Sequence, residues 1–531
     1  MLVKHRIAGH CYCFVMDASL PDASAPADAP INLRLLGRVR VLEALFKSRI
    51  ISRAELVQQT GLARASVGSV VFDLMQAGLV EETADEPVPV ARVTGRPPRL
   101  LSLVPTAAYA LGVDIGHDHV RVILANLVGS PCWDRSHRLA VDHDPERALG
   151  VAADLIGQAL SEQGVAREKI LGVGLGIACP VDAESGELSA EGIMPGWVGV
   201  LPADELAART GFPVGIINDA NAGVLAEQRF GAARESADVV YLRLSFGIGA
   251  GVICGGRMLL GSDGVAGELG HVTVDPAGTV CRCGNRGCLE TVASPPALAA
   301  LLRRSWGRPV SSTDLPGLLR EGDRGTLRAI EDAGDAVGRV LASAVQLLNP
   351  ELIVIGGDLA SAGDALFEPM RHALARGTMR SSTRRLRIVP SALGDSAGVR
   401  GAAALILDAA PRQLGRDLHH FSTDPEGSGA LPAPAGAAPP SDALPADVGG
   451  RLRPRGSAAK RRREAPPRSA AAAAPRSAPA GLSRSALAGL SRAHIRHVRH
   501  DGQPHHEGDT PQGYLPHDHG PKWANSAING P

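Results

Sequence analysis

The sequence predicts an α/β protein with a small helical module, a two-lobed body and a low-complexity tail, and three observations support this division. Helix and strand patterns alternate over residues 31–105, glycine-rich hairpins recur about 130 residues apart over residues 106–410, and the apolar pattern then stops. The 55 basic and 55 acidic side chains cancel, but they are segregated, with net charges of +3 over 31–105, −8 over 106–410 and +6 over 411–531. A neutral total therefore does not exclude nucleic-acid binding.

Residues 1–30 are expected to form a disordered N-terminal segment and linker. The stretch from Leu20 to Pro30 is rich in Ala, Pro and Asp, and the apolar run from Cys11 to Met16 is too short for a signal peptide. No run approaches the roughly 18 apolar residues that a membrane span needs. Eight cysteines in 531 residues do not form a disulfide scaffold. We therefore expect a cytoplasmic protein with no membrane partner.

Residues 31–105 show the elements of a winged helix-turn-helix in their usual order. Ser52 and Glu55 form a capping box that opens the second helix, because the hydroxyl accepts from the amide of Glu55 and the carboxylate reaches back to the amide of Ser52. Glycine follows the second and third helices, where a left-handed residue ends a helix well. The predicted elements are helices over 38–47, 52–60 and 63–75 and strands over 79–81 and 99–103.

The third helix of such a module enters the major groove with its N-terminal residues at the base edges. Here those residues are Arg64, Ser66 and Ser69, whose guanidinium and hydroxyl groups can reach bases and phosphates. Arg96 and Arg99 lie on the predicted wing, where they suit backbone or minor-groove contact. We predict operator DNA as a partner. The alternative is a three-helix protein-interaction module that never touches DNA.

The strongest local motif in the body is Cys281-Arg-Cys283-Gly-Asn-Arg-Gly-Cys288, which follows His271. Three thiolates and one imidazole on a glycine-rich loop match a tetrahedral zinc site. Because four protein ligands leave no open position, the predicted Zn²⁺ is structural rather than catalytic. The alternative is a loop of unrelated free thiols.

A second group of polar residues, Asn218-Asp219-Ala-Asn221, follows a predicted buried strand. A carboxylate at that position can accept a proton from a hydroxyl group, although an Asp after a strand is more often a helix cap. Glu268 and Glu290 add carboxylates on either side of the cysteine loop. Carboxylates and amides that converge on one cleft suit polyhydroxylated ligands.

With these motifs in place, residues 31 to about 408 resemble the ROK family, which groups bacterial repressors, uncharacterised reading frames and sugar kinases. The cysteine loop together with Gly-Glu-Leu-Gly-His is the most specific part of the resemblance. The matching stretches are Val113–Gly116, Gly176–Asp182, Asn218–Asn221, Gly247–Gly251, Gly267–His271, Cys281–Cys288 with Glu290, and Ile355–Gly357.

The resemblance implies a two-lobed actin-like ATPase (ribonuclease-H-like) fold with a sugar between the lobes. It implies that His271 both ligates zinc and faces the sugar, and that Asp219 is the base in members that are kinases. As a hypothesis for a regulator of this kind, we expect a homodimer or a dimer of dimers that places its winged modules on a two-fold-related operator. The implied sugar contacts are Asn218, Asp219, Glu268, His271 and Glu290.

Two glycine turns distinguish a repressor from a kinase. In kinase members the first turn has a sequence similar to Asp-Ile-Gly-Gly-Thr, whereas in this chain the sequence of that turn is Asp114-Ile-Gly116-His-Asp. The second turn, usually Gly-Thr-Gly, is Ser-Phe-Gly247 and is followed by Gly249. We therefore expect no ATP binding and predict a regulator of carbohydrate uptake or catabolism that senses a sugar or sugar phosphate. An ATP-dependent, glucokinase-like sugar kinase with an added DNA-binding domain is the alternative.

Residues 411–531 are rich in Ala, Pro, Ser and Arg and hold nine of the 17 histidines. Such a composition cannot bury enough apolar surface to offset chain entropy, so we expect a disordered basic tail. The run from Lys460 to Arg463 could bind nucleic acid non-specifically. A tail produced by a shifted reading frame is the alternative, and we assign the segment no specific role.

Overall fold

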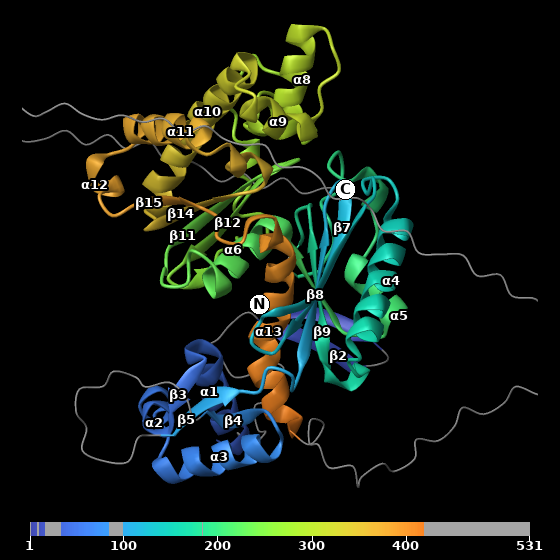
Figure 1. Cartoon of the computed structure of the whole chain (residues 1–531), viewed down its shortest axis with the longest axis vertical. Coiled ribbons are helices and arrows are strands. Elements are labelled where there is room, and N and C mark those ends of the chain that lie inside the picture. Colours follow the sequence, from blue (N-terminus) through green and yellow to red (C-terminus); the bar gives the residue numbers. More distant parts are fainter. Residues whose placement is uncertain (1, 8–9, 16–32, 84–98, 183, 419–531) are drawn as a thin grey trace, which may run out of the picture. The chain divides into compact units, whose positions relative to one another are not determined.

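The structure is a computed structural model that describes residues 2–7, 10–15, 33–83, 99–182 and 184–418 (Figure 1). The chain divides into two units, Met1–Pro432 and Ala433–Pro531, and every described residue belongs to the first. Most of the predicted tail therefore lies outside the described residues. Its first residues do not, because helix α13 (Ala397–Arg416) continues past the boundary that we expected at residue 410.

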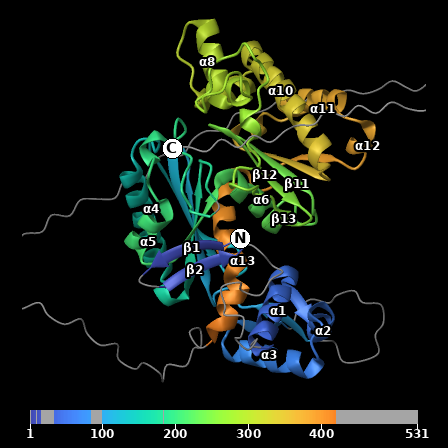
Figure 2. The same cartoon turned by 180° about the vertical axis from the view of Figure 1, so that it is seen from behind.

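The first 15 residues differ from the expectation of a disordered segment. Strands β1 (Leu2–Ile7) and β2 (His10–Val15) pair antiparallel, with Leu2 opposite Val15 and Ile7 opposite His10 (Figure 2). Both strands contain β-branched or aromatic residues, which favour an extended backbone. The predicted linker, from Leu20 to Pro30, lies outside the described residues.

The module over residues 33–103 contains the three predicted helices and the two predicted strands in the predicted order, and a further short strand, β3, that the sequence did not indicate. The capping box of Ser52 and Glu55 forms as predicted, and Gly61 ends the second helix with a φ of 67°. The order of the sheet is β3-β5-β4. The elements are α1 (Leu33–Ser48), β3 (Ile50–Ser52), α2 (Arg53–Thr60), α3 (Arg64–Gln76), β4 (Val80–Thr83) and β5 (Leu100–Leu103).

The first lobe of the body is a five-stranded sheet of order β10-β9-β6-β7-β8. An antiparallel hairpin supplies one side of the sheet, and parallel strands supply the other. Helices α4 and α5 pack their apolar side chains on one face (Figure 1). The elements are β6 (Tyr109–Ile115), β7 (His119–Asn126), β8 (Pro131–Arg138), α4 (Pro145–Gln163), β9 (Ile170–Ile177), α5 (Pro202–Thr210) and β10 (Val214–Asn218).

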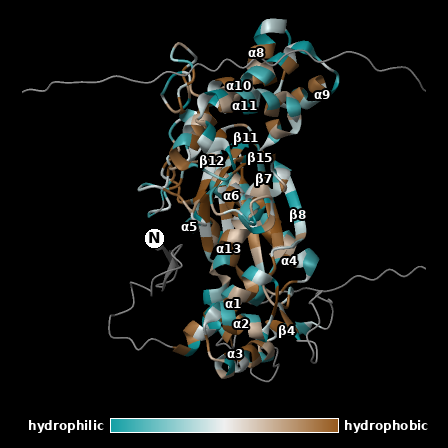
Figure 3. Cartoon of the chain, turned by 90° about the vertical axis from the view of Figure 1, so that its left-hand side faces the viewer, coloured by the Kyte–Doolittle hydropathy of each residue, from teal (hydrophilic) through white to brown (hydrophobic). Residues whose placement is uncertain are grey.

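The second lobe repeats this plan with a five-stranded sheet of order β13-β12-β11-β14-β15, as the two related hairpins of the sequence predicted. Helices α7, α8, α10 and α11 pack apolar residues on one face of this sheet. The hydropathy colouring marks much of the central strands as hydrophobic (Figure 3). The elements are β11 (Val239–Leu244), β12 (Ile248–Cys254), β13 (Arg257–Met258), α7 (Glu290–Ala293), α8 (Pro295–Trp306), α9 (Leu315–Arg320), α10 (Arg324–Leu348), β14 (Leu352–Gly356), α11 (Asp364–Gly377), α12 (Arg380–Thr383) and β15 (Arg387–Pro390).

Helices α6 (Asp219–Phe230) and α13 lie against the other faces of the two sheets and against each other. Glycines permit these close contacts, because a Cβ atom at Gly174 would lie 1.8 Å from the carbonyl oxygen of Ala402. A Cβ atom at Gly401 would similarly lie 1.7 Å from the carbonyl oxygen of Ala222. The two helices therefore connect the lobes through their backbones as well as through their side chains. None of the described helices is long and apolar enough to cross a bilayer.

Candidate functional site

A cavity of about 520 Å³ opens between the two lobes of the body. The strand ends and turns of both sheets line it, together with the cysteine loop. Its wall includes all five predicted sugar contacts: Asn218, Asp219, Glu268, His271 and Glu290.

Asn218 and Asp219 stand where β10 ends and α6 begins. Asn218, rather than the aspartate, is the helix cap: its side-chain oxygen accepts from the amides of Ala220 and Asn221, and its Nδ2 donates to the carbonyl of Cys179 at 3.2 Å. The capping frees the Asp219 carboxylate for the cavity. Burial raises the pKa of Asp219 despite the arginine beside it.

That arginine is Arg243, the main residue of this site that the sequence did not reveal. It comes from β11, and its Nη1 donates to Oδ2 of Asp219 at 2.8 Å. Both side chains are largely buried, with 17% and 15% of their surfaces exposed. The nearby carboxylates of Asp219 and Asp114 keep the guanidinium charged despite its burial and raise its pKa.

Glu268, His271 and Glu290 form the second group of predicted contacts. Burial, together with Asp219 and Glu290, raises the pKa of Glu268 to about 7, and its carboxylate lies 3.7 Å from Nε2 of His271. Glu290 is buried, accepts from the amide of Ile248 at 3.0 Å and pairs with Arg282 at 2.9 Å and 3.2 Å. Glu290 thus holds the cysteine loop against the turn that precedes β12. Glu268 has the carboxylate that is more open to a ligand.

The four predicted zinc ligands converge. Every pair of ligand atoms among His271, Cys281, Cys283 and Cys288 lies within 4.8 Å. The Sγ atoms of Cys283 and Cys288 are 3.8 Å apart, and Nδ1 of His271 is 3.6 Å from Sγ of Cys281. Two sulfur atoms each about 2.3 Å from a tetrahedral zinc ion are separated by about 3.8 Å, so the side chains fit that ion.

The chemistry of this loop also fits a cation. Burial raises the pKa of the Cys288 thiol to about 12, so a thiolate there needs a compensating positive charge. Because Nδ1 of His271 faces the sulfur atoms and Nε2 faces Glu268, one imidazole ring joins the cysteine cluster to the cavity. Gly287, with a φ of 66°, allows the loop to fold back over the carbonyl of Asp275.

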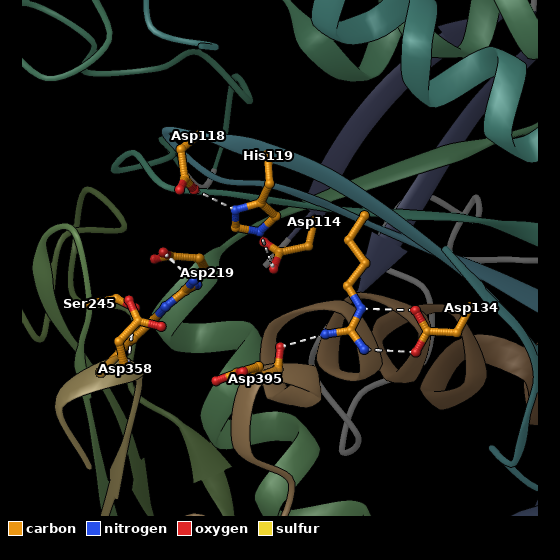
Figure 4. Close-up of polar contacts among 10 residues, drawn as sticks. Asp114, Asp118, His119, Asp134, Asp219, Ser245, Asp358 and Asp395 are labelled. Carbon is orange, nitrogen blue, oxygen red and sulfur yellow. Dashed lines mark hydrogen bonds and ion pairs between the residues drawn. The ribbon is translucent and has the colours of Figure 1, made fainter. Parts of the chain in front are cut away.

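The first glycine turn, between β6 and β7, is filled by its own side chains (Figure 4). The ring of His119 lies over Gly116, where an added Cβ atom would be 2.3 Å from Cε1. Its Nδ1 is 2.9 Å from Asp118 and its Nε2 is 3.5 Å from Asp114. Although burial opposes protonation, hydrogen bonds to these two carboxylates raise the pKa of His119 to about 9.

The second glycine turn, between β11 and β12, meets the first across the cavity. The ring of Phe246 packs on the ring of His117 with centroids 4.4 Å apart, and Nδ1 of His117 lies 2.7 Å from Asp142. Ser245 donates its hydroxyl to Asp358 at 2.8 Å. Gly247 and Gly249 line the cavity beside this contact. Aromatic and paired polar side chains therefore occupy both turns.

In the module, α3 presents Arg64, Ser66 and Ser69 to solvent, while Val67, Val70, Val71 and Leu74 are buried beneath them. Arg99 forms an ion pair with Glu82, as does Arg53, so the wing arginine is engaged within the module. Arg96 lies outside the described residues.

The model of the protein family described as "ROK family" matches residues 110–409 of this chain, which is more than half of its length. The chain belongs to the ROK family. The resemblance inferred from the cysteine loop and the glycine turns is thus confirmed. So is the α/β fold, because the crystal structure of a ROK family transcriptional regulator, a homolog of E. coli Mlc, matches with a TM-score of 0.60 at 28% identity. That match covers 74% of this chain and 100% of the other.

Curated ROK relatives include both repressors and a kinase. The xylose repressor of Caldicellulosiruptor bescii is 29% identical over 388 residues, which is 71% of this chain and 96% of the repressor. The DNA-binding transcriptional repressor Mlc of Escherichia coli is 31% identical over 378 residues, 68% of this chain and 89% of Mlc. The glucokinase of Thermotoga maritima is 40% identical over 310 residues, 56% of this chain and 96% of the kinase. The repressor matches therefore take in more of this chain than the kinase match.

The four arginines that line the cavity of this ROK chain were not predicted from its sequence: Arg121, Arg138, Arg243 and Arg282. Arg243 carried a signal, since it is a charged residue inside an apolar strand, Val239–Leu244, but nothing indicated its partner 24 residues away. Arg282 lies within the cysteine motif and was passed over because it is not a metal ligand. Its guanidinium pairs with Glu290 and lies 5.6 Å from the ring centroid of Phe246.

Proposed function

We propose that this ROK protein is a sugar-responsive, DNA-binding repressor of genes for carbohydrate uptake or catabolism. One observation carries the proposal. The cavity keeps a full set of carboxylate, amide and imidazole groups for a sugar, while side chains of the protein fill both glycine turns that a nucleotide would need. The repressor relatives, whose matches extend over more of the chain than the body alone, support the same assignment.

In this proposal Asp219 and Glu268 accept hydrogen bonds from sugar hydroxyls, and Asn218 and Glu290 hold the cavity wall in place. His271 presents Nε2 to the ligand. The other ring nitrogen would ligate a structural Zn²⁺ together with Cys281, Cys283 and Cys288. The ion, when bound, supplies positive charge that keeps three thiolates together. Sugar binding and the fold of the loop are thereby coupled through one imidazole ring.

Two helices offer a route from the cavity to the module. Helix α6 begins at Asp219, and α13 begins beside Asp114, where a Cβ atom at Gly398 would lie 2.9 Å from that carboxylate. At its other end α13 shares an apolar core with the module, and Gly415 packs on Val39 of α1. A rotation of the lobes about the sugar would therefore move the ends of both helices against α1.

The junction of α6 with the module centres on Arg229. Its guanidinium lies 5.5 Å from the ring centroid of Phe46 in α1 and forms an ion pair with Asp408 in α13. Burial, with repulsion by Arg49, lowers the pKa of Arg229 to about 10. One side chain of α6 thus contacts both α1 and α13. A sugar can shift the DNA-binding equilibrium only by binding one conformation more tightly than the other, and in this proposal the two conformations differ at this junction.

The kinase alternative rests on one observation, the cavity-facing Asp219, together with the glucokinase relative. If Asp219 is a catalytic base, ATP-dependent phosphorylation of glucose should be measurable and Asp219→Asn should abolish it. We expect no turnover, because Asp219 is paired with Arg243 and because Phe246 and His119 occupy the turns.

Operator binding with the full chain tests the proposed function. Fluorescence anisotropy with DNA from the region upstream of the gene should show a specific complex, which a sugar from a panel strengthens or releases at fixed salt. Arg64→Ala should weaken binding and lower the salt slope by about one, since one phosphate or base contact is lost. Arg328→Ala, which changes an exposed arginine of α10, serves as the charge-matched control. A chain that binds neither this DNA nor any sugar would contradict the proposal.

A further inference from the structure

The end of the cavity formed by the two glycine turns determines which form of sugar can enter. A phosphorylated sugar would bring a group with about two negative charges, and a buried phosphate needs unengaged donors or net positive charge. Whether a phosphate can bind at this end therefore depends on whether the donors of the turns and of the charged side chains around them are free, and on the sum of their charges.

The charged donors at this end are already engaged. His119 lies between Asp118 and Asp114, and the backbone amide of Gly116 donates to the carbonyl of His119. Arg243 donates to Asp219, in an ion pair that is itself largely buried.

Two of the other lining arginines are also paired with carboxylates. Arg121 donates to both carboxylate oxygens of Asp134 at 2.9 Å and 2.7 Å, and Arg282 makes two bonds to Glu290. Arg138 is the exception: it lies across the strand pair from His119, it is exposed, it has no ion pair among the described residues, and its charge acts on Asp118. A phosphate at this end would therefore find the charge of Arg138 offset by Asp118, and elsewhere it would have to break pairs that are already formed.

Acidic and basic side chains are nearly balanced over the wall of the cavity as a whole, so the wall has no excess of positive charge for an anion. The side chains that line the cavity include six carboxylates, against four arginines and the imidazolium of His119. Ser245, the hydroxyl nearest the second turn, donates to one of those carboxylates, Asp358. Apart from Arg138, whose charge acts on Asp118, the described side chains at this end therefore offer a phosphate no unengaged charged donor.

We propose that the cavity selects the unphosphorylated form of its sugar, and that Asp118, with the pairs His119–Asp114 and Arg243–Asp219, makes this selection. The inference rests on the proposed function, because it concerns the effector of that same site. Asp118 is the most direct determinant, since it is the exposed member of the group, with 63% of its side chain accessible.

Calorimetric titration of the full chain with matched pairs tests the inference: glucose and glucose 6-phosphate, N-acetylglucosamine and its 6-phosphate, at fixed salt and pH. In any pair that binds, the free sugar should bind at least tenfold more tightly. A phosphorylated member that binds as tightly as its partner, or more tightly, would overturn the inference and leave the proposed function standing.

The variant Asp118→Asn sharpens the test, because it removes one charge from an exposed side chain without removing its hydrogen-bonding capacity. The preference for the free sugar should fall several-fold, while the affinity for the free sugar itself should change less than twofold. Asp154→Asn, which makes the same charge change on the exposed side of α4, should leave the preference unchanged. Equal effects of the two variants would mean that overall charge, and not Asp118, sets the preference.

Inorganic phosphate supplies an arm that does not depend on the identity of the sugar. The wild-type chain should show no saturable phosphate binding at millimolar concentration. Saturable binding that Arg243→Met abolishes would place a phosphate in the cavity and overturn the inference, whether or not any sugar of the panel binds. Failure of every sugar and of DNA, by contrast, would count against the proposed function.

Discussion

The two ends of the cavity hold their carboxylates by different means. At the cysteine-loop end, the residues that contact one another lie close together in the chain, from His271 to Cys288 and on to Glu290. At the glycine-turn end, His119 also has near neighbours in Asp114 and Asp118, but two further contacts join more distant segments, since Asp219 pairs with Arg243 and Ser245 bonds to Asp358, 113 residues away. The first end is a local motif that closes on itself. The second is assembled only when the two lobes fold together.

This difference predicts unequal responses to substitution. A metal loop that depends on four ligands should fail as a unit when one is lost, because the remaining thiolates and imidazole no longer enclose the ion. A set of ion pairs should instead respond pair by pair, with the largest cost where a buried charge loses its partner.

The largest effect is expected from Cys288→Ser. We expect about one zinc per chain in the wild-type protein and a loss of that zinc in the variant, with a decrease of roughly 5 kcal/mol or more in the free energy of unfolding of the 271–290 region. Metal analysis and hydrogen exchange measure the two quantities. Cys254→Ser, at a partly buried cysteine outside the loop, is the control. A wild-type protein that is stable and metal-free would contradict the zinc assignment.

The next effect in size concerns the buried pair. Asp219→Asn leaves the Arg243 charge without its partner and should lower the free energy of unfolding by about 3–5 kcal/mol. Arg243→Met should cost as much, while the double variant should recover part of the loss. Urea denaturation of the three variants gives the coupling energy. Additive losses would show that the two side chains do not depend on each other.

The same contrast explains what the sequence predicted. The capping box at Ser52, the clustering of His271 with three cysteines and the repeated hairpins follow from the spacing of residues along the chain, and the structure contains all three. Arg243 and the contact between His117 and Phe246 depend on which strands become neighbours. No local pattern carries that information, so these residues were missed or were interpreted only as departures from a motif.

A smaller, pH-dependent effect is expected from His119. Its pKa is raised from 6.5 to about 9 in the folded state, so its stabilising contribution is complete below pH 6.5 and is lost as the pH rises through about 9. His119→Gln should therefore cost at most about 3 kcal/mol near pH 6.5 and much less at pH 9.5. Urea denaturation at the two pH values measures this difference. His137→Gln, at an exposed histidine of β8, should show no such dependence.

The smallest effect should come from the contact that joins the two glycine turns. The ring of Phe246 is 42% exposed, so its removal by Phe246→Ala should cost only about 1 kcal/mol. Its coupling to His117→Ala in a double-mutant cycle should nevertheless be about 0.5–1.5 kcal/mol, because the two rings contact each other across the lobes. Phe72→Ala, at a more exposed ring on α3, should show no coupling to His117. A zero coupling for Phe246 as well would mean that the turns only lie side by side, and that the charge pairs alone hold this end of the cavity together.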